Sequence, residues 1–179
     1  MKIAVCGLGS GNYKKDILKK SKEIGREIAK NKCILITGGC YGYPYETSKG
    51  VMEGKGVSIA ISPAKNLKGH KKYNYPIKNF TNFEFTGLGV PGRNLPLVKN
   101  SDGVIIIGGK SGTLVELAIA LHDYKPIGVL KNSGGITDLI PKIVKACKKI
   151  KKQKIIYESN PKRLVNKLIK LIKTKSIVK

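Results

Sequence analysis

The segment from Gly108 to Glu116 (GGKSGTLVE) combines backbone freedom, hydroxyl groups and positive charge in a way that suits anion binding. Gly112 lets an oxyanion approach the backbone, and Ser111 and Thr113 can donate hydroxyl hydrogen bonds to it. Lys110 adds a positive charge. The segment opens an expected helix, where free N–H groups and the helix dipole favour a negative ligand. These residues predict a phosphate-binding loop, although the spacing is not that of a P-loop.

The same segment has a purely structural interpretation. The spacing Thr113-x-x-Glu116 is that of a capping box, in which the glutamate bonds back to the first residue of the helix. The sequence leaves both interpretations open.

Two further glycine-rich segments follow expected strands. Gly7–Asn12 (GLGSGN) departs from G-x-G-x-x-G because its third glycine comes one residue early, so a nicotinamide dinucleotide site is not expected. Gly9 and Ser10 in this segment either form a tight turn or bring a nucleotide close to the backbone. Gly38–Gly42 (GGCYG) follows the second strand and again allows close approach of a ligand.

Gly92-Arg93-Asn94 precedes a short helix on the side of the sheet where ligands are expected. Arg93 is one of only three arginines in the chain. It is either a surface residue or a guanidinium fork that holds a phosphate or carboxylate.

Apolar runs alternate with helix-period stretches along the chain, which predicts one α/β domain over residues 1–179. We expect a doubly wound, Rossmann-like sheet that is mostly parallel and has helices on both faces. The expected strands are Lys2–Cys6, Cys33–Thr37, Val57–Ile61, Phe80–Thr86, Gly103–Ile107, Pro126–Leu130 and Lys154–Tyr157. The expected helices are Lys14–Lys30, Tyr45–Gly54, Arg93–Asn100, Thr113–Tyr124, Thr137–Ile150 and a basic C-terminal helix within 160–179 that starts at Pro161. Residues 62–79 are expected to form a flexible insertion.

Charge and composition narrow the function classes. The 179 residues carry 35 Lys and Arg against 11 Asp and Glu, a net charge of +24. Because nearly all of these cations are lysines without interleaved aromatics, we expect a solvated basic surface, with nucleic-acid binding possible but non-specific. No apolar run is long enough to span a membrane, and the four cysteines form no zinc spacing, so a cytoplasmic protein without a metal site is expected.

The motifs together resemble the LOG-like superfamily. The glycine-rich first loop, I-T-G-G-x-x-G, Arg93 and G-G-x-x-G-T-x-x-E carry this resemblance over roughly residues 1–140. The superfamily includes nucleoside 5′-monophosphate phosphoribohydrolases and molybdenum-cofactor carrier proteins. Gly134-Gly135-Ile136-Thr137-Asp138 is more similar to the carrier branch. Asn94, Gly108 and Lys110 stand where the hydrolases have Lys, Pro and Gly.

The resemblance implies a small phosphorylated ligand, either a nucleoside monophosphate or a molybdopterin-type cofactor, with no other cofactor required. Glu116 and Arg93 would be the catalytic residues if the glycosidic bond is cleaved, with Glu46 a candidate second acid. A homo-oligomer, dimeric or larger, is also implied. The residues expected to bind the phosphate and nucleotide are Gly9, Ser10, Gly38, Gly39, Gly42, Asn94, Gly108, Gly109, Lys110, Ser111, Gly112 and Thr113.

Overall fold

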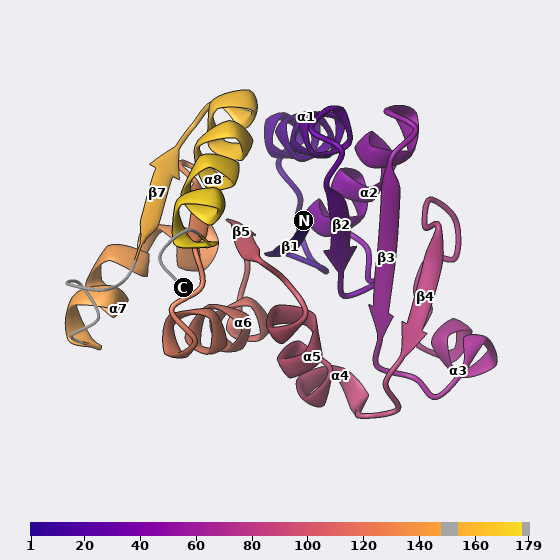
Figure 1. Cartoon of the computed structure of the whole chain (residues 1–179). Coiled ribbons are helices and arrows are strands. Elements are labelled where there is room, and N and C mark those ends of the chain that lie inside the picture. The colour runs from indigo at the N-terminus through magenta and orange to yellow at the C-terminus, as the bar shows by residue number, and fades with distance from the viewer. Residues whose placement is uncertain (148–153, 177–179) are drawn as a thin grey trace.

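The computed structural model describes residues 1–147 and 154–176, and its sheet has seven parallel strands in the order β4-β3-β2-β1-β5-β6-β7 (Figure 1). The strands are β1 (Lys2–Gly7), β2 (Ile34–Thr37), β3 (Val57–Ser62), β4 (Asn82–Phe85), β5 (Gly103–Ile107), β6 (Ile127–Leu130) and β7 (Ile155–Glu158). The order reverses at β1, which pairs with β2 on one side and β5 on the other. The expected doubly wound α/β sheet is confirmed.

Helices flank the sheet and connect its strands. They are α1 (Lys15–Lys30), α2 (Tyr43–Glu53), α3 (Leu67–Lys72), α4 (Gly89–Gly92), α5 (Asn94–Lys99), α6 (Ser111–His122), η1 (Gly135–Asp138), α7 (Ile140–Ala146) and α8 (Pro161–Ser176). Helix α1 illustrates why the sequence folds this way: Ile17, Ile24 and Ile28 recur on one face and are fully buried.

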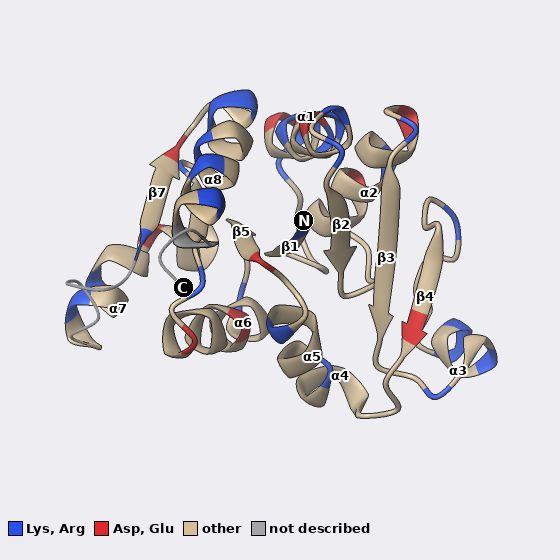
Figure 2. Ribbon diagram, viewed as in Figure 1, with Lys and Arg blue, Asp and Glu red and all other residues tan. Residues whose placement is uncertain are grey.

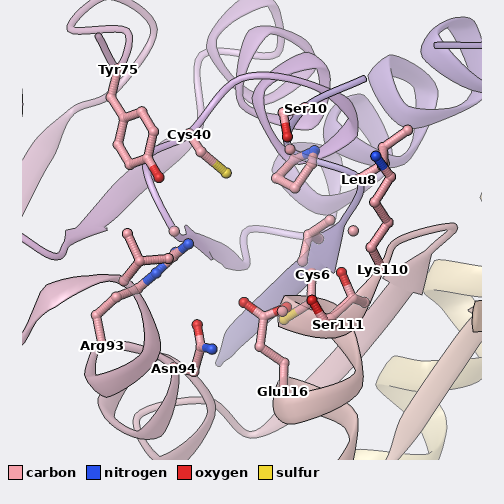
Figure 3. Close-up of a pocket in the computed structure, with 18 residues that line it drawn as sticks. Cys6, Leu8, Ser10, Cys40, Tyr75, Arg93, Asn94, Lys110, Ser111 and Glu116 are labelled. Atoms are coloured by element: carbon pink, nitrogen blue, oxygen red, sulfur yellow. The ribbon is translucent and has the colours of Figure 1, made fainter. Parts of the chain in front are cut away.

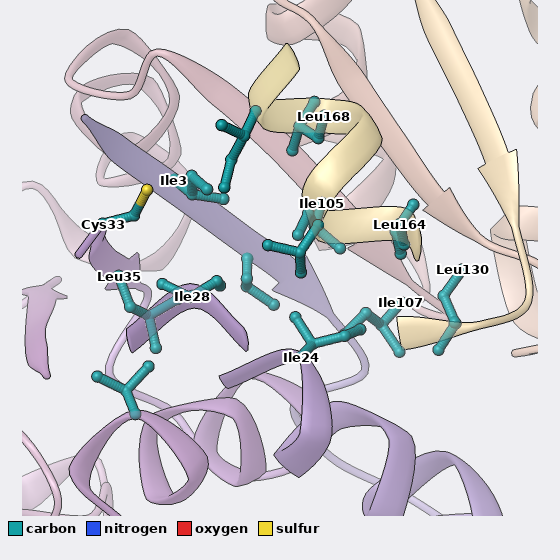
Figure 4. Close-up of a cluster of buried hydrophobic side chains, with 14 of the residues drawn as sticks. Ile3, Ile24, Ile28, Cys33, Leu35, Ile105, Ile107, Leu130, Leu164 and Leu168 are labelled. Atoms are coloured by element: carbon teal, nitrogen blue, oxygen red, sulfur yellow. The ribbon is translucent and has the colours of Figure 1, made fainter. Parts of the chain in front are cut away.

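The core has two layers, one on each face of the sheet. One layer packs β1, β2 and β5 against α1, α2 and α8, through residues that include Ile28, Ile105 and Leu168 (Figure 4). The other packs the opposite face of the sheet against α5, α6 and α7, through Leu97, Leu117 and Val144 among others. Strand β5 is buried along its whole length, as its run of apolar residues predicts.

Two expected elements differ in the structure. Residues 62–79, predicted to lack regular structure, contain α3, which Asn66 caps by accepting a hydrogen bond from the Gly69 N–H at 2.9 Å. The expected helix 137–150 divides into η1 and α7 because Pro141 lies at the start of the α-helix, and residues 148–150 lie outside the described part of the chain. The expected C-terminal helix is present as α8, and residues 177–179 are also outside the description.

Candidate functional site

A pocket of about 340 Å³ opens at the carboxyl ends of β1 and β2, between the first glycine-rich loop, α5 and the start of α6 (Figure 3). This is the point where the strand order reverses, and ligands of doubly wound sheets bind in that crevice. The volume lies at the lower end of the range for small-molecule sites. The pocket therefore has the place and the size of a mononucleotide-sized ligand site.

Arg93 is the most informative side chain in this pocket. Its side chain is only 6% exposed, and its Nε and Nη1 have no hydrogen-bond partner among the described residues. Unpaired nitrogens of a buried guanidinium are costly, so this group favours an anion or another acceptor in the pocket. The residue across from it is Gly38, where a Cβ would overlap the Arg93 guanidinium, so the arginine can take this position only beside a glycine.

Glu116 faces Arg93 from the first turns of α6, and its side chain is also buried, 5% exposed. Burial raises the pKa of this carboxyl to about 7, while Arg93 and a hydrogen bond with the Cys6 thiol oppose the increase. Burial likewise raises the pKa of the Cys6 thiol well above its usual value. The pocket thus holds a carboxyl that changes protonation state near neutral pH.

The capping-box interpretation of Thr113 and Glu116 is wrong. Helix α6 begins at Ser111, so its N-cap is Lys110, which makes no side-chain capping bond. Thr113 lies inside the first turn, and Glu116 extends into the pocket. The glutamate is therefore available to a ligand.

The opposite wall of the pocket is formed by the start of α6 and the first glycine-rich loop. Ser10, Lys110 and Ser111 line it, and the space next to Gly112 is open within 4 Å of where a Cβ would be. The Lys110 ammonium reaches over the first loop, 3.1 Å from a Cβ built at Gly11. Free N–H groups at this helix start, hydroxyls and a lysine together form a wall opposite Arg93 whose chemistry suits an anion.

The structure gathers most, but not all, of the predicted residues. Those that line the pocket are Gly9, Ser10, Gly38, Arg93, Asn94, Lys110, Ser111, Gly112, Thr113 and Glu116. Four predicted glycines do not line it; Gly39, Gly42, Gly108 and Gly109 have positive φ and shape the turns around the pocket. Glu46, considered as a second acid, is paired with Lys49 at 2.6 Å on α2 and does not line the pocket.

Tyr75 and Cys40 are lining residues that the sequence did not assign to the site. The Tyr75 ring lies near Arg93 and packs edge-on against His70, with centroids 5.6 Å apart. His70 is fully buried and donates from Nε2 to the Pro76 carbonyl at 3.1 Å, which holds the Tyr75 loop in place. Cys40 sits in a glycine-rich loop, and that position was the only sequence signal for it.

Neither a metal centre nor a membrane segment is found in the described residues. No group of three or more His, Cys, Asp or Glu side chains is arranged to hold a metal within residues 1–147 and 154–176. In the same part of the chain, no helix is long and apolar enough to cross a bilayer.

The family model described as the SLOG cluster4 family matches residues 1–165. The chain belongs to the SLOG cluster4 family. An uncharacterized protein of Archaeoglobus fulgidus is 30% identical over an alignment of 137 residues. The alignment covers 73% of this chain and 82% of that protein. The predicted resemblance to LOG-like proteins is confirmed.

Solved structures of similar fold include several ligand-binding proteins. The molybdenum cofactor binding protein from Rippkaea orientalis is 31% identical, with a TM-score of 0.75, over 99% of this chain and 97% of that chain. The molybdenum cofactor carrier protein from Chlamydomonas reinhardtii is 24% identical, with a TM-score of 0.77, and the match covers 96% of this chain and 98% of that chain. DNA processing protein A from Helicobacter pylori, described with a single-stranded DNA binding mode, is 21% identical, with a TM-score of 0.64. The match covers 95% of this chain and 80% of that chain. The last two likenesses concern the fold alone.

Proposed function

We propose that this SLOG cluster4 protein binds and carries a small phosphorylated ligand of the nucleotide or molybdopterin type. The observation that carries the proposal is the buried Arg93 guanidinium, which belongs to the pocket lining and whose Nε and Nη1 lack partners among the described residues. Across the pocket stand the free N–H groups of the α6 start, with Lys110 and Ser111. A phosphorylated ligand satisfies both walls at once.

The comparisons support the carrier form of this proposal. The similar protein of Rippkaea orientalis is described as binding the molybdenum cofactor, and it is the solved relative with 31% identity. In the present chain Asn94 replaces the lysine of the hydrolase pattern, and Glu116 has no second carboxyl beside it among the described pocket residues. Glycoside hydrolysis ordinarily uses a pair of carboxyl groups.

Calorimetric binding of AMP, GMP, CMP, UMP and ribose 5-phosphate tests the proposal, alongside mass spectrometry of small molecules that co-purify with the protein. We expect at least one phosphorylated compound to bind, and Arg93→Met to weaken it by about tenfold or more, because hydrogen bonds to charged groups contribute about 1.5–3 kcal/mol. Arg26→Met is the matched control, since Arg26 pairs with Glu53 on the surface of α1 and α2. Equal binding by both variants, or no binding and no co-purifying ligand, would overturn the proposal.

One feature favours hydrolysis as a second candidate: burial raises the pKa of the Glu116 carboxyl to about 7, in the range that suits acid–base groups of enzymes. Cleavage would release a free base and ribose 5-phosphate from a nucleoside monophosphate. Base release that disappears in Glu116→Gln establishes this candidate. Retention of intact nucleotide over many hours excludes it and leaves the carrier function.

Two properties of the whole protein belong to the same proposal. We propose that the protein forms a homo-oligomer. We also propose that any binding of nucleic acid comes from the net charge of +24 and shows no preference for particular bases. Affinity of that kind falls steeply with salt.

A further inference from the structure

A second, larger hollow lies next to the ligand pocket. It has a volume of about 930 Å³ and is bounded by the end of β3, α3 and the turn between β4 and α4. We call it the lysine groove, after Lys65, Lys68 and Lys72, which line it together with Tyr73 and Leu88. None of the sequence motifs pointed to this groove.

The described lining of the lysine groove carries basic residues and no acidic ones. From Ser62 to Phe83 the sequence contains no Asp or Glu, and among the described residues that line the groove none is acidic. No ion pair within the described part of the chain includes Lys65, Lys68 or Lys72. Figure 2 shows these cations gathered on and before α3, at the opposite end of the sheet from the basic helix α8. Such a concentration of like charge in a concave surface attracts anions.

The groove is held in shape by its backbone. Asn66 caps α3, the Gly87 N–H donates to the Ala64 carbonyl at 3.0 Å, and the Gly89 N–H donates to the Pro63 carbonyl at 3.0 Å. His70 fixes the far side of α3 through Ser62 and Pro76, at 2.9 and 3.1 Å. The lysines therefore project from a preformed surface.

A thin wall separates the groove from the ligand pocket. Tyr73 lines the groove and stacks on Tyr75, which lines the pocket, with ring centroids 5.5 Å apart. On the other side, Gly89 lines the groove and its neighbour Val90 lines the pocket. A molecule that leaves the pocket beside Tyr75 meets the lysine groove directly.

We propose that the lysine groove binds a second phosphate-bearing unit of the ligand whose first unit occupies the Arg93 pocket. The class of ligand is a dinucleotide, two nucleoside units joined through phosphate. Lys65, Lys68 and Lys72 receive the linking phosphate charge, and the ring of Tyr73 with Leu88 gives an apolar face for the second base. This inference rests on the proposed function, because the first unit must bind in the pocket.

The test compares AMP, GMP, CMP and UMP with the 5′-phosphorylated linear dinucleotides pApA, pGpG, pCpC and pUpU by calorimetry. In the unaltered protein, we expect a dinucleotide to bind about tenfold more tightly than its mononucleotide. This gain in affinity should shrink as the salt concentration is raised. The triple substitution Lys65→Gln, Lys68→Gln and Lys72→Gln removes the gain and leaves mononucleotide binding unchanged. The triple substitution Lys142→Gln, Lys170→Gln and Lys173→Gln is the control, because it removes the same charge from exposed positions on α7 and α8.

The outcomes separate the two proposals. Mononucleotide binding without a dinucleotide gain overturns the inference and leaves the proposed function intact. An equal loss of the gain in both triple variants also overturns it, because overall charge rather than the groove would then be responsible. Binding of neither class of nucleotide overturns the inference and, if no other phosphorylated compound binds, the proposed function with it.

Discussion

At the scale of single residues, the site depends on how Arg93 and Gly38 fit together. The guanidinium occupies the space that a side chain at Gly38 would take, so the glycine determines where the arginine lies. Gly112, on the other wall, has open space where a Cβ would be. The two glycines therefore shape the site differently: Gly38 accommodates a protein group, and Gly112 leaves open space at the pocket.

Gly38→Ala and Gly112→Ala separate these roles. Gly38→Ala displaces the Arg93 guanidinium, and we expect ligand affinity to fall by about tenfold or more. Gly112→Ala places its methyl group in the ligand's space, so affinity falls, but the protein becomes more stable by about 0.4–1 kcal/mol because alanine restricts the unfolded chain. Calorimetry and thermal unfolding measure the two effects. Unchanged affinity in Gly112→Ala would mean that the ligand does not approach the start of α6.

The Glu116 carboxyl makes stability depend on pH. Its pKa in the folded protein is about 7, above the ordinary value of 4.5, so the folded state binds more protons between these values. The free energy of unfolding therefore falls as pH rises from about 4.5 to 7, by up to about 3 kcal/mol, and levels off above pH 7. Glu116→Gln, which stays neutral, removes this contribution.

Urea unfolding at pH 5 and pH 8 measures the effect. We expect Glu116→Gln to gain stability relative to the unaltered protein as pH rises between these values. Glu23→Gln, an exposed change on α1, is the control. Parallel pH profiles for Glu116→Gln and the unaltered protein would contradict the assignment of a buried carboxyl.

At the scale of elements, the strands and their glycine-rich ends could be predicted because their signals are local. The apolar run Gly103–Ile107 has the bounds of β5, and the cap Asn160 before Pro161 is confirmed by its bond from the Arg163 N–H at 2.9 Å. Tyr75 could not be predicted as a lining residue, since its place depends on the contact with His70 and on the fold of residues 62–79. The helix start at Ser111 was missed because Thr113 and Glu116 imitate a cap.

Glu158 joins two elements, β7 and α8. Its carboxylate accepts hydrogen bonds from Lys167 at 2.9 Å, from Arg163 at 3.1 Å and from the Ser159 and Asn160 N–H groups. The Lys167 ammonium, followed by the backbone donors, lowers the pKa of Glu158 to about 2. Because its folded pKa is depressed, the contribution of Glu158 to stability is present above about pH 4.5 and is lost as pH falls toward 2.

Glu158→Gln tests this link between β7 and α8. We expect Glu158→Gln to have a lower melting temperature than the unaltered protein at pH 7. The difference between the two melting temperatures should narrow as pH falls from 4.5 to 2. Circular dichroism across that range provides the measurement, with Glu23→Gln again as the control. A difference of constant size at all pH values would show that the carboxylate charge is not what holds the start of α8.

At the scale of the whole molecule, helix α6 stands out because it carries little charge on a strongly basic chain. The twelve residues of α6 include no Lys or Arg and a single acid, the buried Glu116. Leu114 and Val115 of this helix are 39% and 44% exposed, and Leu95 of the neighbouring α5 is 51% exposed. Two copies of a +24 chain repel each other, so they can approach most easily through a face with few lysines, and α5 and α6 contain only Lys99. If the proposed homo-oligomer forms, we therefore predict that a second copy of this chain packs on the α5–α6 face.

The Leu114→Lys, Val115→Lys double variant tests that assignment. We expect the unaltered protein to sediment as a dimer and the variant as a monomer, because the new charges meet their symmetry mates across an isologous contact. Leu139→Lys, at a leucine before α7 that is 51% exposed, is the control and keeps the dimer. Higher salt strengthens the dimer by screening the net charge, whereas it weakens any contact with nucleic acid, so the two kinds of association respond in opposite directions. A monomeric unaltered protein, or dissociation of the Leu139→Lys control, would contradict an α5–α6 interface.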